Sequence, residues 1–207
     1  MRRKIALFCN VEQDCVVQSK DVNSIYKVPL MMHAQNLDQI VLRKTGMPVE
    51  GEPHMEPWLK FIEKMDNATE TVTIGLVGKY VELQDAYKSI GEALFHAATY
   101  AGYKLNLIYV HSEKLTDANV AERFAGMDGV IIAPGFGQRG IDGKFVALKW
   151  CRTNDVPTFG ICLGMQCMVI EFARNVLGLE EANSTEMNPH TPDNVCLLYT
   201  SPSPRDS

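Results

Sequence analysis

The most useful absences in this 207-residue sequence concern charge and long apolar runs. Basic residues are not in excess: the net charge is −5 and the pI is about 5.5, which argues against nonspecific binding to nucleic acid or to a membrane surface. No apolar run reaches the length needed to span a bilayer, and the run at residues 5–9 is too short for a signal peptide. We therefore expect a globular chain with no nucleic-acid partner and no membrane partner. Its 46% hydrophobic and 22% charged residues are ordinary for that class.

The sequence also lacks a cysteine pattern typical of a disulfide framework or a metal site. Its six cysteines show no paired spacing, and nothing downstream of Cys162 and Cys167 completes a zinc-binding set. Unpatterned cysteines fit a reducing compartment, so we expect a cytoplasmic protein with no metal ligands in this chain. A Gly-x-x-x-x-Gly-Lys-Ser/Thr phosphate-binding loop is absent as well.

Strand-like and helix-like segments alternate from residue 71 onward. Apolar, β-branched or alternating runs predict strands at residues 71–77, 104–110, 129–133 and 156–161. Apolar residues at helical spacing predict helices at 89–101, 116–125, 142–153 and 165–176, the first opened by a capping box of Ser89 and Glu92 and closed by Gly102. This alternation predicts the α/β class, with a doubly wound, mostly parallel sheet whose functional loops gather at the carboxyl ends of the strands.

A different pattern occupies the first 70 residues. We expect a strand at residues 4–10, a helix at 29–42 with Pro29 near its start, and a helix at 55–65 after a Gly/Pro-rich linker. The expected domain limits are 1–45 for the end of one domain, 46–70 for a linker with a helix, and 71–195 for an α/β domain that is incomplete at its C-terminus. Residues 196–207 are Ser/Pro-rich without a periodic apolar face, and we set them aside as a non-native tail.

Cys162 is the strongest candidate for a catalytic residue. The predicted strand at 156–161 runs into Gly-Ile-Cys-Leu-Gly at residues 160–164, and a helical pattern follows at once. This is the arrangement of a nucleophile elbow, with cysteine in place of serine. So sharp a turn needs small residues beside the nucleophile, and the partial positive charge of a helix N-terminus stabilises a thiolate. The alternative is a small buried core cysteine, which is the role we assign to Cys167.

A glycine-rich turn lies one strand–helix unit before the cysteine. It reads Pro-Gly-Phe-Gly-Gln-Arg-Gly over residues 134–140 and follows the predicted strand at 129–133. Glycine lets backbone N–H groups approach a substrate oxygen closely, so such a turn can form the oxyanion hole that acyl transfer needs. Alone it is typical of a plain connecting loop; together with a cysteine elbow on the next strand it indicates function.

These residues resemble a known family. The Pro-Gly-Phe-Gly turn at 134–137 and the string Gly-Ile-Cys-Leu-Gly-Met-Gln at 160–166 are similar to those of class I glutamine amidotransferase domains, which release ammonia from glutamine through a Cys-His-Glu triad. Strings at residues 4–9, 20–26, 78–80, 85–89 and 183–186 narrow the resemblance to the CTP synthase family, and it covers residues 1–195. The resemblance implies a class I amidotransferase-like sheet, preceded by the C-terminal remnant of a P-loop-type synthetase domain, in a fragment of a longer protein.

The resemblance also implies roles for individual residues. Cys162 would attack the carboxamide carbon of glutamine and form a thioester, while Gly135 and the Leu163 amide would bracket the oxyanion. A carboxylate at Glu186 could pair with the α-ammonium group of the substrate, although without the resemblance it would be taken for a solvated loop acid. The full set implied to bind glutamine is Gly135, Leu163, Gly164, Met165, Gln166 and Glu186.

For the first 45 residues the resemblance implies nucleotide contacts. Lys4 would bind UTP or CTP, and Lys20, Asp21 and Val22 would lie beside ATP; the alternatives are a strand-edge lysine and a polar turn. The intact enzyme would be a ligase that makes CTP from UTP, ATP and glutamine. CTP would act as inhibitor and GTP as activator, Mg²⁺ would be bound with ATP by ligands outside this chain, and the assembly would be a homotetramer.

One part of the implied triad has no counterpart in the sequence. The His-x-Glu pair should follow Glu186 at some distance, but four of the five histidines precede the elbow and His190 is too close to Glu186. A thiol without a base is only partly activated, so we expect this chain alone to be inactive. Two other hypotheses stay open: another Cys-dependent amidotransferase or γ-glutamyl hydrolase on a similar sheet, and a non-catalytic binding module.

Overall fold

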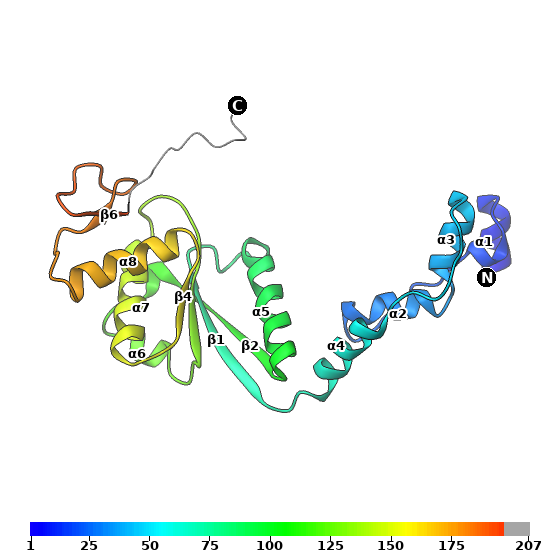
Figure 1. Cartoon of the computed structure of the whole chain (residues 1–207), viewed down its shortest axis with the longest axis horizontal. Coiled ribbons are helices and arrows are strands. Elements are labelled where there is room, and N and C mark those ends of the chain that lie inside the picture. The colour runs from blue at the N-terminus through cyan, green and yellow to red at the C-terminus, as the bar shows by residue number, and fades with distance from the viewer. Residues whose placement is uncertain (197–207) are drawn as a thin grey trace. The chain divides into compact units, whose positions relative to one another are not determined.

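The computed structural model describes residues 1–196, and the chain divides after Asn67 into two compact units (Figure 1). The segment set aside as a tail lies, from residue 197 onward, outside the described residues. Over residues 1–196, none of the helices has the length and apolar character that crossing a membrane demands.

The first unit, Met1–Asn67, is helical. An aromatic cluster holds its last helix: the ring centroids of Tyr26, Trp58 and Phe61 lie 5.3 to 5.8 Å apart. The indole N–H of Trp58 also donates a hydrogen bond to the carbonyl oxygen of Tyr26 at 2.9 Å. The elements of this unit are α1 (Arg2–Cys9), the 3-10 turns η1 (Gln13–Cys15) and η2 (Ile25–Lys27), α2 (Val28–His33), α3 (Leu37–Thr45) and α4 (Glu56–Asn67).

Two predictions for this unit are wrong. Residues 4–10 form most of helix α1 and not a strand, because the segment is rich in strong helix formers, and α1 ends at Asn10 in the left-handed conformation with φ 52°. The helix predicted at 29–42 is two helices, because Asn36 also takes a left-handed conformation, with φ 56°. Asparagine adopts this conformation more readily than most residues. The helix predicted at 55–65 is confirmed as α4.

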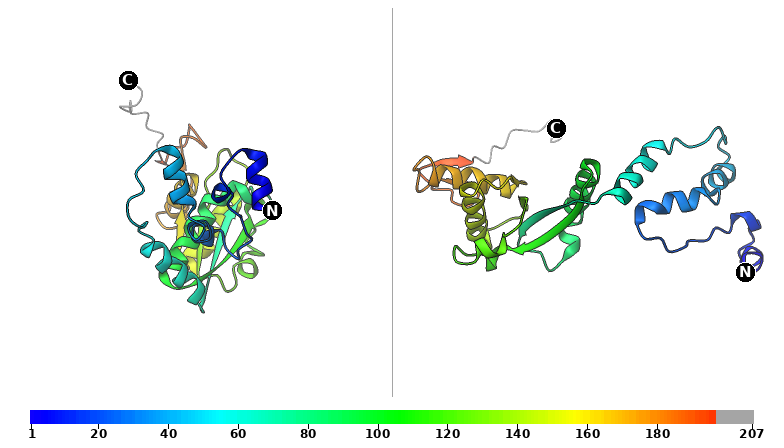
Figure 2. Two further views of the ribbon diagram at one scale, coloured as in Figure 1. Left: turned by 90° about the vertical axis from the view of Figure 1, so that its right-hand side faces the viewer. Right: turned by 90° about the horizontal axis from the view of Figure 1, so that it is seen from below.

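The second unit is built on a parallel sheet (Figures 1 and 2). Four strands lie in the order β2-β1-β3-β4, and every neighbouring pair is parallel. This confirms the predicted α/β class and the doubly wound parallel sheet. The strands are β1 (Thr71–Gly78), β2 (Lys104–His111), β3 (Gly129–Ile132) and β4 (Thr158–Gly160); the helices are α5 (Lys88–Ala101), α6 (Val120–Arg123), α7 (Ile141–Thr153) and α8 (Leu163–Asn175), with 3-10 turns η3 (Gln84–Tyr87) and η4 (Ser112–Lys114). A smaller sheet pairs β5 (Asn183–Ser184) with β6 (Asn194–Cys196).

Helices cover both faces of the four-stranded sheet: α5 lies on one face, and α7 and α8 lie on the other (Figure 1). Successive strand residues point to opposite faces, so Leu76 packs with Tyr87 and the α5 side, while Val77 belongs to the larger core formed with α7 and α8. Both side chains are completely buried. Strand β2 lies on one side of β1 and strand β3 lies on its other side, so the direction in which strands are added to the sheet reverses after β2. The carboxyl ends of β1 and β3 therefore form a topological switch point, a place where sheets of this kind bind ligands.

The ends of helix α5 agree with the prediction only in part. Its N-cap is Tyr87, which makes no side-chain capping hydrogen bond. The predicted capping box of Ser89 and Glu92 is therefore not formed, because the helix begins two residues too early for Ser89 to cap it. Gly102, left-handed with φ 88°, ends the helix as predicted.

Helix α6 is shorter than the predicted helix at 116–125. The side chain of Asn119 accepts a hydrogen bond from the N–H of Thr116 and donates one to the carbonyl of Lys114, both at 2.9 Å. These bonds satisfy backbone groups locally and compete with helical hydrogen bonding. Only Val120–Arg123 is α-helical as a result.

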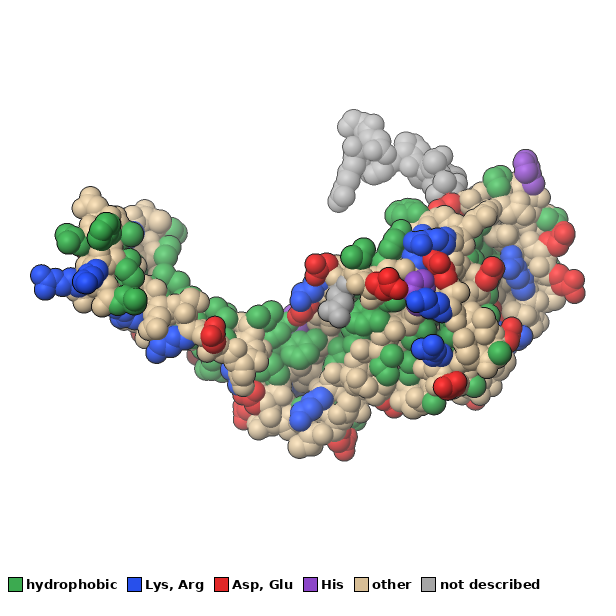
Figure 3. All heavy atoms as spheres, turned by 180° about the vertical axis from the view of Figure 1, so that it is seen from behind, with side chains coloured by type: hydrophobic (Ala, Val, Ile, Leu, Met, Phe, Trp, Pro, Cys, Tyr) green, Lys and Arg blue, Asp and Glu red, His purple; other side chains and the backbone are tan. Residues whose placement is uncertain are grey.

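Charges of both signs are interspersed over the face of the molecule shown in Figure 3. Exposed ion pairs of this chain include Arg139 with Glu113 at 3.1 Å and Lys149 with Asp117 at 3.7 Å. Pairs of this kind contribute little to stability, since water screens them. The face shown carries no extended field of one sign.

The approach of α8 to strand β3 is close enough to require glycine. A Cβ at Gly164 would lie 2.1 Å from the carbonyl oxygen of Ile132, and a Cβ at Gly160 would lie 2.5 Å from the carbonyl carbon of Gly164. Neither backbone contact can be relieved by a side-chain rotation. These two glycines therefore fix how near the start of α8 lies to the sheet.

One ion pair ties α7 to α8 on the same face. The guanidinium group of Arg152 donates to both carboxylate oxygens of Glu171 at 2.8 to 3.1 Å, and Asn175 donates to the same carboxylate at 3.0 Å. Glu171 is 3% exposed, whereas Arg152 is 32% exposed. The buried Glu171 carboxylate therefore relies on Arg152 to balance its charge, while the Arg152 guanidinium group is still in contact with water.

We expect Gly164→Ala to lower the free energy of unfolding by roughly 3 kcal/mol, because α8 or β3 must shift to admit the new methyl group. Gly91→Ala is the matched control. Its Cβ would meet only side-chain atoms at 3.5 Å or more in the middle of α5, so we expect it to stabilise the chain by about 0.5–1 kcal/mol. Urea unfolding followed by circular dichroism measures both. Equal and small effects would show that α8 has room to move.

We expect Arg152→Met to cost about 2–3 kcal/mol, near the lower end for breaking a buried pair, because it leaves the Glu171 carboxylate buried while water reaches the guanidinium side. Lys149→Met is the control on the same helix. It removes the exposed ion pair between Lys149 and Asp117 and should change the free energy of unfolding by less than about 0.5 kcal/mol. Parallel urea titrations of the two variants measure the difference. An Arg152 variant as stable as the Lys149 variant would contradict the prediction.

Candidate active site

Cys162 lies in the tight turn between β4 and α8. Its backbone has φ 53° and ψ −111°, a conformation that residues other than glycine rarely adopt. Three backbone hydrogen bonds fix the turn: Ile161 N–H to the Ile132 carbonyl at 3.0 Å, Gly164 N–H to the Ile161 carbonyl at 2.9 Å, and Gln166 N–H to the Cys162 carbonyl at 3.1 Å. Conformations under this kind of strain cluster at active sites. The strand–turn–helix geometry of an elbow is present.

Burial separates Cys162 from the other cysteines of this unit. The side chain of Cys162 is exposed, whereas Cys151 and Cys167 are buried. Burial raises the pKa of the Cys167 thiol to about 11, and it raises the pKa of Cys151 as well, so both stay protonated near neutral pH. Cys162 also precedes the first residue of a 13-residue helix, whose first N–H groups have no acceptor within the helix. Among these three thiols, only Cys162 combines access with a favourable field.

The glycine-rich turn lies beside the elbow. Gly135 comes soon after β3, and a Cβ built on it would lie 3.8 Å from Cδ2 of Leu163, the first residue of α8. Leu163 itself is 3% exposed, so its side chain packs in the core while its amide belongs to the start of the helix. Gly135 thus lies near the side chain of Leu163, and the part that the amides of these two residues play in binding an oxyanion stays a prediction.

A cavity of about 310 Å³ adjoins the first turns of α8; it is lined by Met165, Gln166, Val169, Ser184, Glu186, Val195 and Cys196. Three residues expected to bind glutamine, Met165, Gln166 and Glu186, therefore share one cavity. Within the described residues, the side-chain oxygen Oε1 of Gln166 is buried and has no hydrogen-bond partner. Such an atom is costly to leave unpaired, so Gln166 has an acceptor free for a hydrogen-bond donor.

Two lysines at the glycine-rich turn were not identified from the sequence. Lys144 donates to the carbonyl of Ala133 at 2.7 Å, and Lys79 donates to the carbonyl of Phe136, so ammonium groups hold both ends of the turn. The signal for Lys144 was its place on the apolar stripe of α7. It falls at helical spacing with buried residues of that helix, namely Ile141, Ala147, Leu148 and Cys151.

The residues expected to bind nucleotides belong to the first unit. Lys4 lies on helix α1 and not at a strand edge, and its side chain is exposed. Lys20, Asp21 and Val22 form an exposed stretch without regular secondary structure between η1 and η2. Their contact with nucleotides stays a prediction.

Glu12, Asp14 and Cys15 form a group of potential metal ligands, with ligand atoms within 4.8 Å of one another. Both carboxylates already have cationic partners: Arg43 lies 2.5 Å from Asp14, and Lys44 lies 2.8 Å from Glu12. The hydrogen bond from Arg43 lowers the pKa of Asp14. The group is explained as an exposed ion-pair network.

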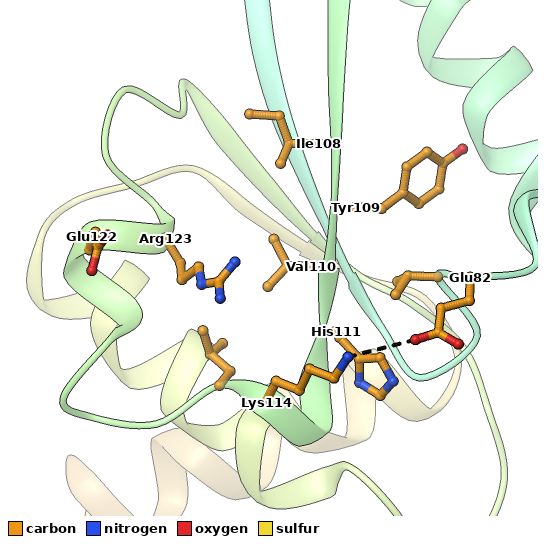
Figure 4. Close-up of a pocket in the computed structure, with 10 residues that line it drawn as sticks. Glu82, Ile108, Tyr109, Val110, His111, Lys114, Glu122 and Arg123 are labelled. Carbon is orange, nitrogen blue, oxygen red and sulfur yellow. Dashed lines mark ion pairs between the residues drawn. The ribbon is translucent and has the colours of Figure 1, made fainter.

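A second cavity, of about 500 Å³, lies along the edge strand β2 (Figure 4). Polar side chains that line it include Glu82, His111, Lys114 and Arg123, and the ammonium of Lys114 pairs with Glu82 at 3.6 Å. Strands β1 and β3 separate β2 from β4, so this cavity is remote in the sheet from the elbow. The exposed Cys162 immediately precedes α8, so we assign the acyl-transfer chemistry to the cavity beside the first turns of that helix.

Comparison with known proteins agrees with this assignment. The sequence model of the family "Glutamine amidotransferase class-I" matches residues 82–204, and that of "CTP synthase N-terminus" matches residues 1–47. The first match extends to residue 204 and so includes most of the segment 196–207, which was predicted to be a non-native tail.

Individual relatives point the same way. The chain is 62% identical over 196 residues to a CTP synthase of Porphyromonas gingivalis (strain ATCC 33277) and 59% identical over 195 residues to one of Bacteroides fragilis (strain ATCC 25285), covering 95% and 94% of this chain. It spans 36% and 37% of the length of these relatives.

A solved structure shares the fold. The glutaminase domain of Trypanosoma brucei CTPS with bound acivicin is 40% identical, covers 60% of this chain and 49% of its own, and superposes with a TM-score of 0.56. The class-I model covers more than half of this chain, and the relatives and the solved structure agree with it on the family. The chain therefore belongs to the class-I glutamine amidotransferase family, in its CTP synthase branch.

Proposed function

We propose that Cys162 is the nucleophile of a glutaminase site. Its thiolate attacks the carboxamide carbon of glutamine, and the amides at Gly135 and Leu163 stabilise the oxyanion that forms. The carbon–nitrogen bond then breaks, ammonia leaves with a transferred proton, and a glutamyl thioester remains. Water hydrolyses the thioester to glutamate and restores the thiol. The base that takes the thiol proton belongs to the His-x-Glu pair that the family resemblance places well after Glu186.

The observation that carries this proposal is the position of Cys162 relative to the cavity beside α8. An exposed thiol at positive φ precedes the helix whose Gln166 offers an unpaired buried oxygen to that cavity. A glutamine molecule can supply what the cavity lacks: its α-ammonium group provides donors for Gln166 and a partner for the Glu186 carboxylate. The printed title of the Trypanosoma brucei relative, with acivicin bound in a glutaminase domain, supports the same assignment.

For the whole protein we propose the CTP synthase reaction. ATP phosphorylates the 4-oxygen of UTP, and ammonia from the glutaminase site displaces the phosphate. Mg²⁺ accompanies ATP through ligands outside this chain, CTP inhibits, GTP activates, and the enzyme works as a homotetramer in the cytoplasm. In this proposal Lys4 contacts UTP or CTP, while Lys20, Asp21 and Val22 lie by ATP. The match of residues 1–47 to the CTP synthase N-terminus supports these roles.

The proposed domain limits follow from the same assignment. Residues 1–45 belong to the synthetase domain, 46–70 form the linker with α4, and 71–195 belong to the amidotransferase domain. The division of the chain after Asn67 supports a boundary in this region. A separate γ-glutamyl hydrolase is not favoured, since it gives no reason for the N-terminal match.

We expect acivicin, a glutamine-mimicking electrophile, to label the chain at Cys162 and excess glutamine to slow the labelling. Cys162→Ala should abolish it, because Cys196, the thiol that lines the cavity, is only partly exposed and burial raises its pKa. Cys9→Ala is the control, since Cys9 is an exposed thiol of the first unit, and it should leave labelling unchanged. Mass spectrometry of proteolytic peptides measures the site. Undiminished labelling of the Cys162 variant would refute the assignment.

We expect Glu186→Gln to weaken the protection that glutamine gives against acivicin by roughly 10- to 100-fold in concentration, because a charge-assisted bond to the α-ammonium group is lost. Glu181→Gln, an exposed acid of the preceding turn, serves as control and should leave protection as it is. Iodoacetamide, which carries no α-ammonium group, should react with Cys162 equally fast in both variants. Unaltered glutamine protection in Glu186→Gln would remove this residue from the site.

A further inference from the structure

Lys144 is a buried ammonium group that the proposed reaction leaves without a role. It lies on α7, is 2% exposed, and donates a hydrogen bond to the Ala133 carbonyl at 2.7 Å. Within residues 1–196, no carboxylate lies at ion-pair distance from it. Burying a lysine ammonium group costs free energy, because the charge loses its hydration. Such a lysine is therefore expected to have a nearby negative charge or a function.

Two thiols and a second lysine lie around Lys144. Burial lowers the pKa of Lys144, the ammonium of Lys79 lowers it further, and thiolates at Cys167 and Cys162 would raise it. Cys167 is itself buried with a pKa of about 11, so it stays a neutral thiol over the working range. Of the two thiols in this set, only Cys162 is exposed.

The position of Lys144 also bears on the oxyanion hole. A Cβ on Gly135 would lie 3.9 Å from the ammonium nitrogen of Lys144, 3.6 Å from Cε of Lys79 and 3.8 Å from Cδ2 of Leu163. The two lysines hold the carbonyls of Ala133 and Phe136 on either side of Gly135. A carbonyl held in this way fixes the orientation of the peptide groups on either side of Gly135.

We propose that Lys144 is a positioning residue of the glutaminase site, which fixes the turn at residues 133–137 through the Ala133 carbonyl and places a positive charge near the Cys162 thiol. Lys79 supports the same turn from its other end. This inference rests on the proposed function of Cys162, but it concerns the thiol before any glutamine is bound. It can therefore fail while Cys162 remains the nucleophile.

The test measures the rate at which iodoacetamide alkylates Cys162 in the full chain, between about pH 6 and pH 10, by peptide mass spectrometry. Cys9, an exposed thiol of the other unit, is the internal reference in every sample. We expect Lys144→Met to slow alkylation of Cys162 several-fold at about pH 7 and to move the half-maximal rate upward by roughly one pH unit, because a buried charge next to the thiolate is removed. The rate at Cys9 should not change.

Lys144→Gln keeps a donor for the Ala133 carbonyl without the charge, and it serves where Lys144→Met fails to fold. It should show the same upward move of the pH profile with a near-native thermal melt. Lys149→Met, from the exposed side of α7, is the matched control and should leave the profile in place. Identical pH profiles in wild type and a folded Lys144→Gln would overturn the proposal. Acivicin labelling of the same samples reports separately on the glutamine site.

Discussion

The close contact between helix α8 and strand β3 is the constraint on which the rest of the site depends. With glycine at residue 164, the helix backbone lies directly against the Ile132 carbonyl, and with glycine at 160 the strand can turn into the helix without a spacer. Since β4 ends at Gly160 and α8 begins at Leu163, only two residues make the connection. Cys162 takes its strained backbone conformation because no longer loop is available.

The same geometry sets the chemistry of the thiols. Two cysteines five positions apart lie on opposite sides of one boundary: Cys162 at the mouth of the helix in water, and Cys167 inside the core between α7, α8 and the sheet. Burial raises the pKa of the inner thiol, whereas the outer thiol is reached by water and lies at a helix N-terminus, where the partial positive charge favours anions. Reactivity in this fold is thus decided by depth and field, with the same side chain at both positions.

Much of the second unit could be predicted because its signals are local. Apolar runs and helical spacing indicated the four strands and the order of the helices, and Gly-x-Cys-x-Gly indicated the elbow. What failed was decided by single polar residues or by distant partners. Asn36 splits one helix, Asn119 shortens another, and the first segment forms helix α1, although an apolar run of that kind is also typical of a strand.

The buried Lys144 shows more clearly what sequence patterns cannot predict. Helical spacing places Lys144 on an apolar stripe, which marks it as unusual, but nothing in the sequence says that its ammonium group meets the Ala133 carbonyl. The shared cavity of Met165, Gln166 and Glu186 is similar in kind. It arises because the loop that follows α8 folds back over its first turns, and a contact across 20 residues has no local signature.

The backbone angle at residue 162 has one more consequence, for which nucleophiles the fold can accept. A side chain branched at Cβ is a severe outlier at φ 53°, because its second substituent collides with the neighbouring peptide. Threonine is therefore unsuited to this position although its hydroxyl is a competent nucleophile elsewhere, while serine and cysteine fit equally well by shape. Among hydroxyl and thiol side chains of this size, the sharpness of the bend thus leaves serine and cysteine before reactivity is considered.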